Sequence, residues 1–232
     1  MQRSARPAWL LFLFVTACSS APAPLPEGTG AGLVAFDAAA PASTQVWGPP
    51  ERHVGDQFAL VRGGKQRIEF KVAAITDEGY VLVDGVHNRL KRGRDLSNLG
   101  EWGPEGDEPL HLLSPADVRF HWPLWVGKRW RCQYSERVIG AKKAMPVETS
   151  YEVEDLDHVV TPAGTFAALR IKRTARLVDA DIYDMVSIIW YAPDIGIEVR
   201  QTVADTIVEL VEWKHAAPTP SSGEPSKQAS SK

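Results

Sequence analysis

Apolar and polar residues alternate one by one over much of this 232-residue chain, and this alternation strongly limits the folds that the chain can adopt. In the segment 67–72, Ile68, Phe70 and Val72 alternate strictly with charged residues. The same period of two runs through 130–135, 169–172 and 195–200. Because successive side chains of a strand point to opposite faces, each segment predicts a strand with one buried and one solvated face.

Turn signals separate these segments, and helical periodicity is scarce. The turn signals are Gly63-Gly64 and the segments 77–79 (DEG), 162–164 (PAG) and 193–196 (PDIG). The β-branched and aromatic run 187–191 (SIIWY) predicts a strand that is buried on both faces. Many short strands joined by tight turns predict an all-β fold, in which an antiparallel sheet forms a roll, a sandwich or an incomplete barrel.

A short internal similarity refines this prediction. The segment 54–58 (VGDQF) resembles 126–130 (VGKRW), and in both a glycine precedes an aromatic residue that opens a strand. We interpret the similarity as two related β-meanders, at about 50–85 and 120–205. Between them, 93–108 is expected to be a polar loop rich in glycine.

The amino terminus has the pattern of an export signal. Arg3 and Arg6 precede an apolar run at 8–17, which is too short for the ~20 residues that span a bilayer. The run ends in 15–18 (VTAC), which resembles the bacterial lipobox. This resemblance implies diacylglycerol on the Cys18 sulfur, cleavage before Cys18 and acylation of the new amino terminus. The alternative is ordinary signal cleavage after Ala21 or Ala23.

These features divide the chain into four parts. Residues 1–17 are the predicted signal peptide, and 45–214 form the predicted β-domain. The segments 18–44 and 215–232 are rich in small residues and proline, so we expect a disordered tether and a disordered tail. Removal of the signal peptide also removes two arginines and makes the formal net charge of −3 more negative. Nucleic acid is therefore not an expected partner.

Three segments in the second half resemble a family of exported proteins. They are 123–130 (PLWVGKRW), 161–166 (TPAGTF) and 190–196 (WYAPDIG). Together they are similar to exported β-rich bacterial proteins of the domain-of-unknown-function 3108 type. The resemblance implies an antiparallel β-rich fold and no reaction, and it supplies no catalytic residues.

The sequence predicts no metal site, cofactor or catalytic centre. The six histidines form no i,i+2 or i,i+4 pair, and 179–184 (DADIYD) lacks the glycine that a calcium loop needs at its sixth position. Cys132 shares a strand face with Trp130 and Tyr134, which indicates a buried, inert thiol. We therefore do not expect an enzyme.

Two clusters remain candidates for binding. Arg89, Lys91, Arg92 and Arg94 form a basic cluster, which is either a solvated turn or a contact for anionic lipid head groups or envelope polyanions. His121, Trp122, Trp125 and Trp130 either fill a core or line an apolar cavity.

The leading hypothesis is a lipid-anchored protein of the bacterial cell envelope that acts as a non-enzymatic binding or scaffold module. Its partners would be the membrane, through the lipid anchor, and an envelope protein, lipid or polyanion. By the resemblance to bacterial lipoproteins, Ser19 after the cysteine implies sorting to the outer membrane, on its periplasmic side. The alternative is a lipid or lipoprotein carrier with an apolar cavity, and the third hypothesis is an envelope hydrolase.

Overall fold

The computed structural model describes residues 34–35, 39–178 and 184–216. Among these residues, no helix has the length and apolar character needed to cross a bilayer. The strands are β1 (Val34–Ala35), β2 (Gln57–Arg62), β3 (Gln66–Ile75), β4 (Gly79–Asp84), β5 (Arg89–Gly93), β6 (Asn98–Trp102) and β7 (Pro109–Asp117). They continue with β8 (Arg129–Val138), β9 (Met145–Thr161), β10 (Gly164–Leu177), β11 (Met185–Ala192), β12 (Ile197–Val203) and β13 (Thr206–Lys214).

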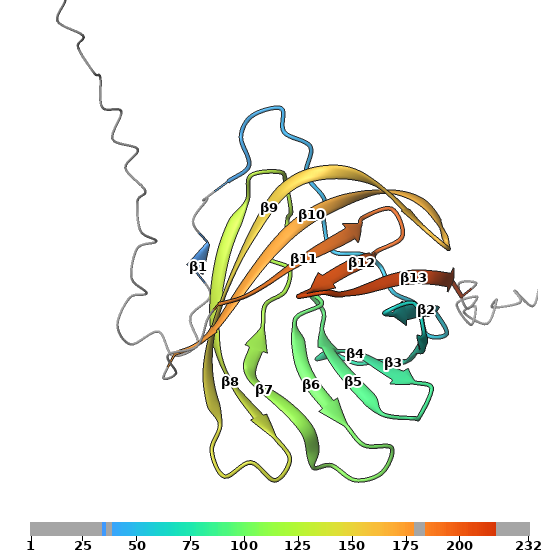
Figure 1. Ribbon diagram of the computed structural model, residues 1–232, viewed down its shortest axis with the longest axis vertical. Coiled ribbons are helices and arrows are strands. Elements are labelled where there is room, and N and C mark those ends of the chain that lie inside the picture. The colour runs from blue at the N-terminus through green and yellow to red at the C-terminus, as the bar shows by residue number, and fades with distance from the viewer. Residues whose placement is uncertain (1–33, 36–38, 179–183, 217–232) are drawn as a thin grey trace, which may run out of the picture.

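The strands β2 to β13 form a closed antiparallel barrel (Figure 1). Each pairs with the next along the chain, and β13 returns to pair with β2. On β8, only the segment 135–138 pairs with β7. At the other end of β8, Trp130 and Arg131 pair with β1. The predicted all-β antiparallel fold is confirmed. The closed ring is more specific than the roll, sandwich or incomplete barrel that the sequence left open.

The alternation of side chains produces the expected faces. Val72 is fully buried, while its neighbours Lys71 and Ala73 are both exposed. Trp130 and Cys132, two residues apart on β8, are both 0% exposed. The prediction for 187–191 is wrong in part. Ile189 and Tyr191 are buried, but Ile188 and Trp190 are only half-buried, because one face of β11 is not fully covered.

Apolar residues gather in two clusters. The first packs around Trp130, Tyr151 and Tyr191 and joins β8, β9, β10 and β11. The second lies where β9 and β10 approach β12 and β13, and includes Val199 and Leu210. The long strands β9 and β10 arch over one side of the molecule (Figure 1).

The similarity between 54–58 and 126–130 reflects one repeated backbone geometry. Gly55 and Gly127 have φ of 98° and 95°, values that favour glycine. The N–H of Gly55 donates to the Val72 carbonyl, and the N–H of Gly127 donates to the Val153 carbonyl. In each case the turn begins a strand and ties it to the strand that follows.

The repeat does not divide the sheet into two separate meanders. Pairing continues without interruption from β4 through β8, so 93–108 is not only a loop. It contains β6, where Trp102 is 8% exposed and Gly100 allows the His111 backbone to come close. A strand of only five residues, with a glycine at its centre, has too little alternation to be recognised in the sequence.

Several predicted features lie outside the described residues. They are the signal peptide 1–17, the lipidation site Cys18, most of the tether 18–44, most of the acidic segment 179–184 and the tail from 217. Within the predicted tether, Val34 and Ala35 form β1. At the other end, the backbone N–H of Ala216 donates to Asp56 Oδ1 at 2.9 Å.

Candidate functional site

A cavity of about 270 Å³ lies inside the barrel. Its walls come from β2, β3, β4 and β5 on one side and from β11, β12 and β13 on the other. The apolar lining includes Phe58, Leu60, Phe70, Leu82 and Leu90, all of which are half-buried. Their apolar surface is therefore incompletely covered by other protein atoms.

The cavity also has a charged part built from distant segments. Arg52 precedes β2, Arg92 belongs to β5, Arg119 follows β7 and Glu198 belongs to β12. All three arginines interact electrostatically with Glu198, which places their guanidinium groups in one region. The exposed Arg62 also lines the cavity. Glu198 is the one carboxylate among the described lining residues, so positive charge is in excess.

Glu198 is already paired. One carboxylate oxygen accepts a charge-assisted hydrogen bond from Arg119 Nη2 at 2.6 Å, and the other forms an ion pair with Arg119 Nε at 2.6 Å. Burial lowers the pKa of Arg119, but the Glu198 carboxylate outweighs that effect and raises the pKa above its ordinary value. Burial lowers the pKa of Arg92 to about 10, which still leaves the guanidinium charged at neutral pH.

Tyr191 connects the cavity to the packed region of the molecule. Its ring lies 4.7 Å from the Phe120 ring and 5.7 Å from the Trp122 ring, measured between centroids. The residue is 1% exposed and lines the cavity, yet its hydroxyl has no hydrogen-bond partner among the described residues. Burial raises the pKa of Tyr191, so the hydroxyl keeps its proton and remains a donor.

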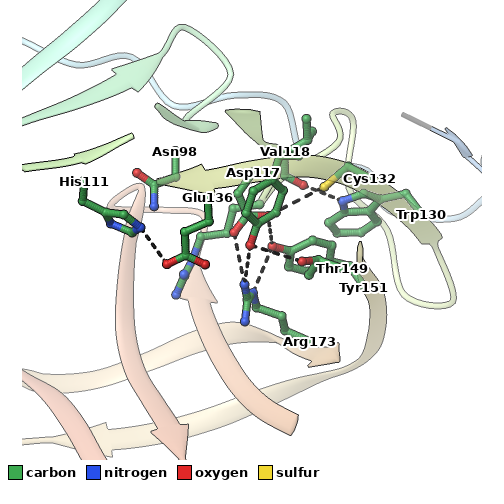
Figure 2. A network of polar contacts seen from close by, with 12 residues as sticks. Asn98, His111, Asp117, Val118, Trp130, Cys132, Glu136, Thr149, Tyr151 and Arg173 are labelled. Carbon is green, nitrogen blue, oxygen red and sulfur yellow. Dashed lines mark hydrogen bonds and ion pairs between the residues drawn. The ribbon is translucent and has the colours of Figure 1, made fainter. Parts of the chain in front are cut away.

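A buried polar network holds the segment that carries Arg119 into the cavity (Figure 2). Asp117 is 3% exposed and accepts a hydrogen bond from the Tyr151 hydroxyl at 2.5 Å. Its other oxygen accepts from Arg173 at 3.3 Å. One residue later, the Val118 carbonyl accepts from the Trp130 indole at 2.8 Å. Asp117 and Val118 are thus fixed directly before Arg119.

Cys132 belongs to this network, and its thiol has low reactivity. Its sulfur lies 3.7 Å from Asp117 Oδ1, and the side chain is fully buried. Figure 2 shows this contact as a dashed line. Burial, together with the nearby Asp117 carboxylate, raises the pKa of the thiol to about 12. The prediction of a buried Cys132 is confirmed, and almost no thiolate exists at neutral pH.

The predicted basic cluster is not one surface. Arg92 faces the cavity and donates to the Asn98 side-chain oxygen, whereas Arg89 donates to the Gly103 and Gly106 carbonyls. The ammonium of Lys91 lies 4.3 Å from the centre of the Trp102 ring, and the Arg94 guanidinium lies 5.8 Å from that of Tyr80. Strand alternation in β5 separates Arg92 from its neighbours.

None of the four predicted cavity residues is among the lining residues of the cavity. Trp130 is fully buried and stacks on Tyr151, with a centroid distance of 5.0 Å. Trp125 is buried and lies 4.3 Å from the Lys128 ammonium. Trp122 stacks on Phe120, and His121 is half-buried near Trp130.

Sequence reasoning missed Arg52, Arg119, Tyr191 and Glu198. Glu198 was expected on a solvated face, and it does face open space, but that space is the barrel interior. A more useful signal was present in β2, β3 and β4, where the apolar positions of three consecutive strands form one wall.

A larger hollow elsewhere in the described part of the chain has a different character. A second hollow of about 330 Å³ is lined largely by exposed polar and charged residues, including Glu69, Lys71 and Lys214. No group of three or more histidine, cysteine, aspartate or glutamate side chains in this part of the chain is placed to hold a metal ion.

Comparisons with known proteins find similarities in structure and none in sequence. No protein-family model and no curated protein matches this sequence, so the resemblance to the domain-of-unknown-function 3108 type remains a prediction. The chain is similar in structure to the hypothetical lipoprotein YmcC from Escherichia coli K12, with a TM-score of 0.48 and 11% identity, over 72% of this chain and 90% of that one. It is also similar to a provisionally named lipoprotein from Parabacteroides distasonis, with a TM-score of 0.41 and 12% identity, over 73% of this chain and 99% of that one.

Proposed function

We propose that this protein is a lipid-anchored component of the bacterial cell envelope, on the periplasmic side of the outer membrane, whose barrel is a non-enzymatic binding module. The observation that carries the proposal is the interior cavity, in which half-buried apolar side chains surround open space. Its volume of about 270 Å³ lies near the lower end of the ~300–1,000 Å³ typical of ligand sites. The module would take up one small molecule with an apolar body.

The residues that line the cavity favour a binding function over a hydrolytic one. The described lining residues include no serine, cysteine or histidine. The carboxylate of Glu198 is held by Arg119 on both oxygens, so it is poorly placed to act as a base. The remaining lining is apolar surface with positively charged hydrogen-bond donors, and such a lining is suited to the recognition of a ligand.

Filling the cavity tests the proposal. Leu60 lines the cavity from β2, so Leu60→Trp should occupy much of the space without adding charge. Lys71 on β3 is exposed and does not line the cavity, which makes Lys71→Trp the matched control. Binding of the neutral fluorophore N-phenyl-1-naphthylamine to the purified full chain is the measurement.

We expect the unchanged protein and Lys71→Trp to bind the fluorophore equally, and Leu60→Trp to bind it at least ~10-fold more weakly, the effect of about 1.4 kcal/mol. Circular dichroism would verify that both variants keep the sheet. If Leu60→Trp bound as tightly as Lys71→Trp, the interior cavity would not be the binding site.

A further inference from the structure

Two arginines of the cavity, Arg52 and Arg92, carry charge that no carboxylate balances at ion-pair distance within the described part of the chain. Arg52 donates to the Gly196 carbonyl, and its guanidinium lies 6.0 Å from the centre of the Phe58 ring. Arg92 donates to the side-chain oxygen of Asn98. Both acceptors are neutral, and the nearby Glu198 is occupied by Arg119.

The surroundings of these arginines make an anion favourable. Burial weakens the solvation of both groups, as the lowered pKa values of Arg52 and Arg92 reflect. Arg92 also lies within the repulsive field of Arg119. A negative charge placed between the arginines would interact strongly, because the surrounding protein screens charge less than water does.

Tyr191 gives an independent indication of a ligand. Tyr191 lines the cavity, and its buried hydroxyl lacks a hydrogen-bond partner among the described residues. Tyr191 interacts electrostatically with Arg52, so the two donors serve the same part of the cavity. Buried hydroxyl groups normally have partners, and a ligand oxygen would provide the one that is missing here.

Resting on the proposed function, we propose that the cavity binds a single-chain amphiphile with an anionic head group. The head-group oxygens interact with Arg52 and Arg92 and accept the hydrogen bond of Tyr191. The apolar chain lies against Phe58, Leu60 and the neighbouring apolar wall. A cavity of about 270 Å³ is small for a ligand site, which fits one short chain and not a two-chain phospholipid.

Displacement of N-phenyl-1-naphthylamine from the full chain tests this inference with three ten-carbon probes. Decanoate and decyl phosphate carry an anionic head group, and decanol is neutral. We expect both anions to displace the fluorophore at concentrations at least ~10-fold below that of decanol. The tighter of the two anions would distinguish a carboxylate from a phosphate as the preferred head group.

Single substitutions test whether these residues cause the preference for anionic probes over decanol. Arg52→Gln and Arg92→Gln should each reduce the anion advantage at least threefold, with little effect on decanol. Tyr191→Phe keeps the ring and removes the hydroxyl, so a smaller reduction is expected. Lys91→Gln is the matched control, because it removes one positive charge from the same strand, at a position outside the cavity lining.

The outcomes separate this inference from the proposed function. Equal displacement by decanol and decanoate would overturn the anionic head group and leave the binding cavity standing. Failure of the unchanged protein to bind the fluorophore or any ten-carbon probe would overturn both. Should an arginine variant not fold, the comparison of decanoate with decanol on the unchanged protein still decides the question.

Discussion

At the residue scale, Asp117 is the side chain on which the buried network most depends. It accepts hydrogen bonds from Tyr151 and Arg173 and lies next to the Cys132 sulfur. Arg173 also donates to the hydroxyls of Tyr134 and Tyr151, so both residues of the ion pair have further partners. A buried ion pair of this kind is costly to break, because the remaining charge stays buried without compensation.

We predict that Asp117→Asn lowers the free energy of unfolding by about 3–5 kcal/mol. The change keeps the size of the side chain and removes the charge that compensates Arg173, whose side chain is 17% exposed. Urea unfolding followed by tryptophan fluorescence is the measurement.

Arg176→Gln is the control for this prediction. Arg176 lies on β10, the strand that also carries Arg173, and forms an ion pair with Glu148. Unlike Arg173, its side chain is 57% exposed. We expect a loss of about 1 kcal/mol or less, since exposed ion pairs contribute little. Equal losses for Asp117→Asn and Arg176→Gln would contradict the central role of Asp117.

At the element scale, the ring closes where the last strand, β13, meets the first strand of the barrel, β2. Asp56 stands immediately before β2 and is 2% exposed. Its carboxylate accepts hydrogen bonds from the backbone N–H groups of His53 and Ala216 and lies 3.3 Å from His215 Nδ1. Asp56 thereby fastens the chain after β13 to the start of β2.

The contribution of this connection between β13 and β2, here called the seam, to the stability of the protein should depend on pH. Burial raises the pKa of Asp56, but the hydrogen bonds from His53, Ala216 and His215 outweigh burial and hold the pKa below its ordinary value of 3.8. Because the unfolded carboxyl takes up a proton at a higher pH than the folded one, protonation favours unfolding. The stabilisation is complete above the ordinary pKa and is lost as pH falls through the lower, folded value.

We predict that Asp56→Asn destabilises the protein by about 1–3 kcal/mol near pH 6, and that the difference from the unchanged protein disappears well below pH 3.8. Thermal unfolding at a series of pH values measures both quantities. A difference that stayed constant down to pH 2 would show that the charge of Asp56 does not stabilise the seam.

At the scale of the whole molecule, the number of strands explains why a cavity exists. Side chains can just fill a barrel of about eight strands, and the interior widens as strands are added. With twelve strands in the ring, large aromatic side chains such as Trp130 and Tyr151 fill one region. The remaining space, beside β2 to β5, is the cavity.

The proposed anchor also concerns the molecule as a whole. We predict that Cys18→Ser leaves the protein in the soluble fraction of the cell envelope, whereas the unchanged protein sediments with membranes, because stable attachment needs more than one acyl chain. Fractionation with immunoblotting is the measurement, and Ser19→Ala is the control. Equal membrane retention of Cys18→Ser and Ser19→Ala would exclude acylation of Cys18 as the anchor.

Local patterns were sufficient to predict several of the strands and most of their buried faces. Strand alternation depends on neighbouring residues alone, so Ile68, Phe70 and Val72 could be assigned to one face, and Cys132 to a buried face, without tertiary information. The glycines at 55 and 127 likewise mark turns whose backbone geometry is local. The short strand β6 escaped detection because its five residues contain too little alternation.

The candidate site was decided by tertiary structure. Arg52, Arg92 and Glu198 are far apart in the chain, and closure of the ring brings them to one region of the interior. In an open sheet the polar face would be solvent-exposed, so the sequence alone placed Glu198 in water. In the closed barrel Ile197 and Glu198 both line the cavity, beside a register shift in the pairing of β11 with β12 that local alternation does not reveal. The sequence thus determined the alternation within single strands, and the closure of twelve strands, with this register shift, determined which side chains line the cavity.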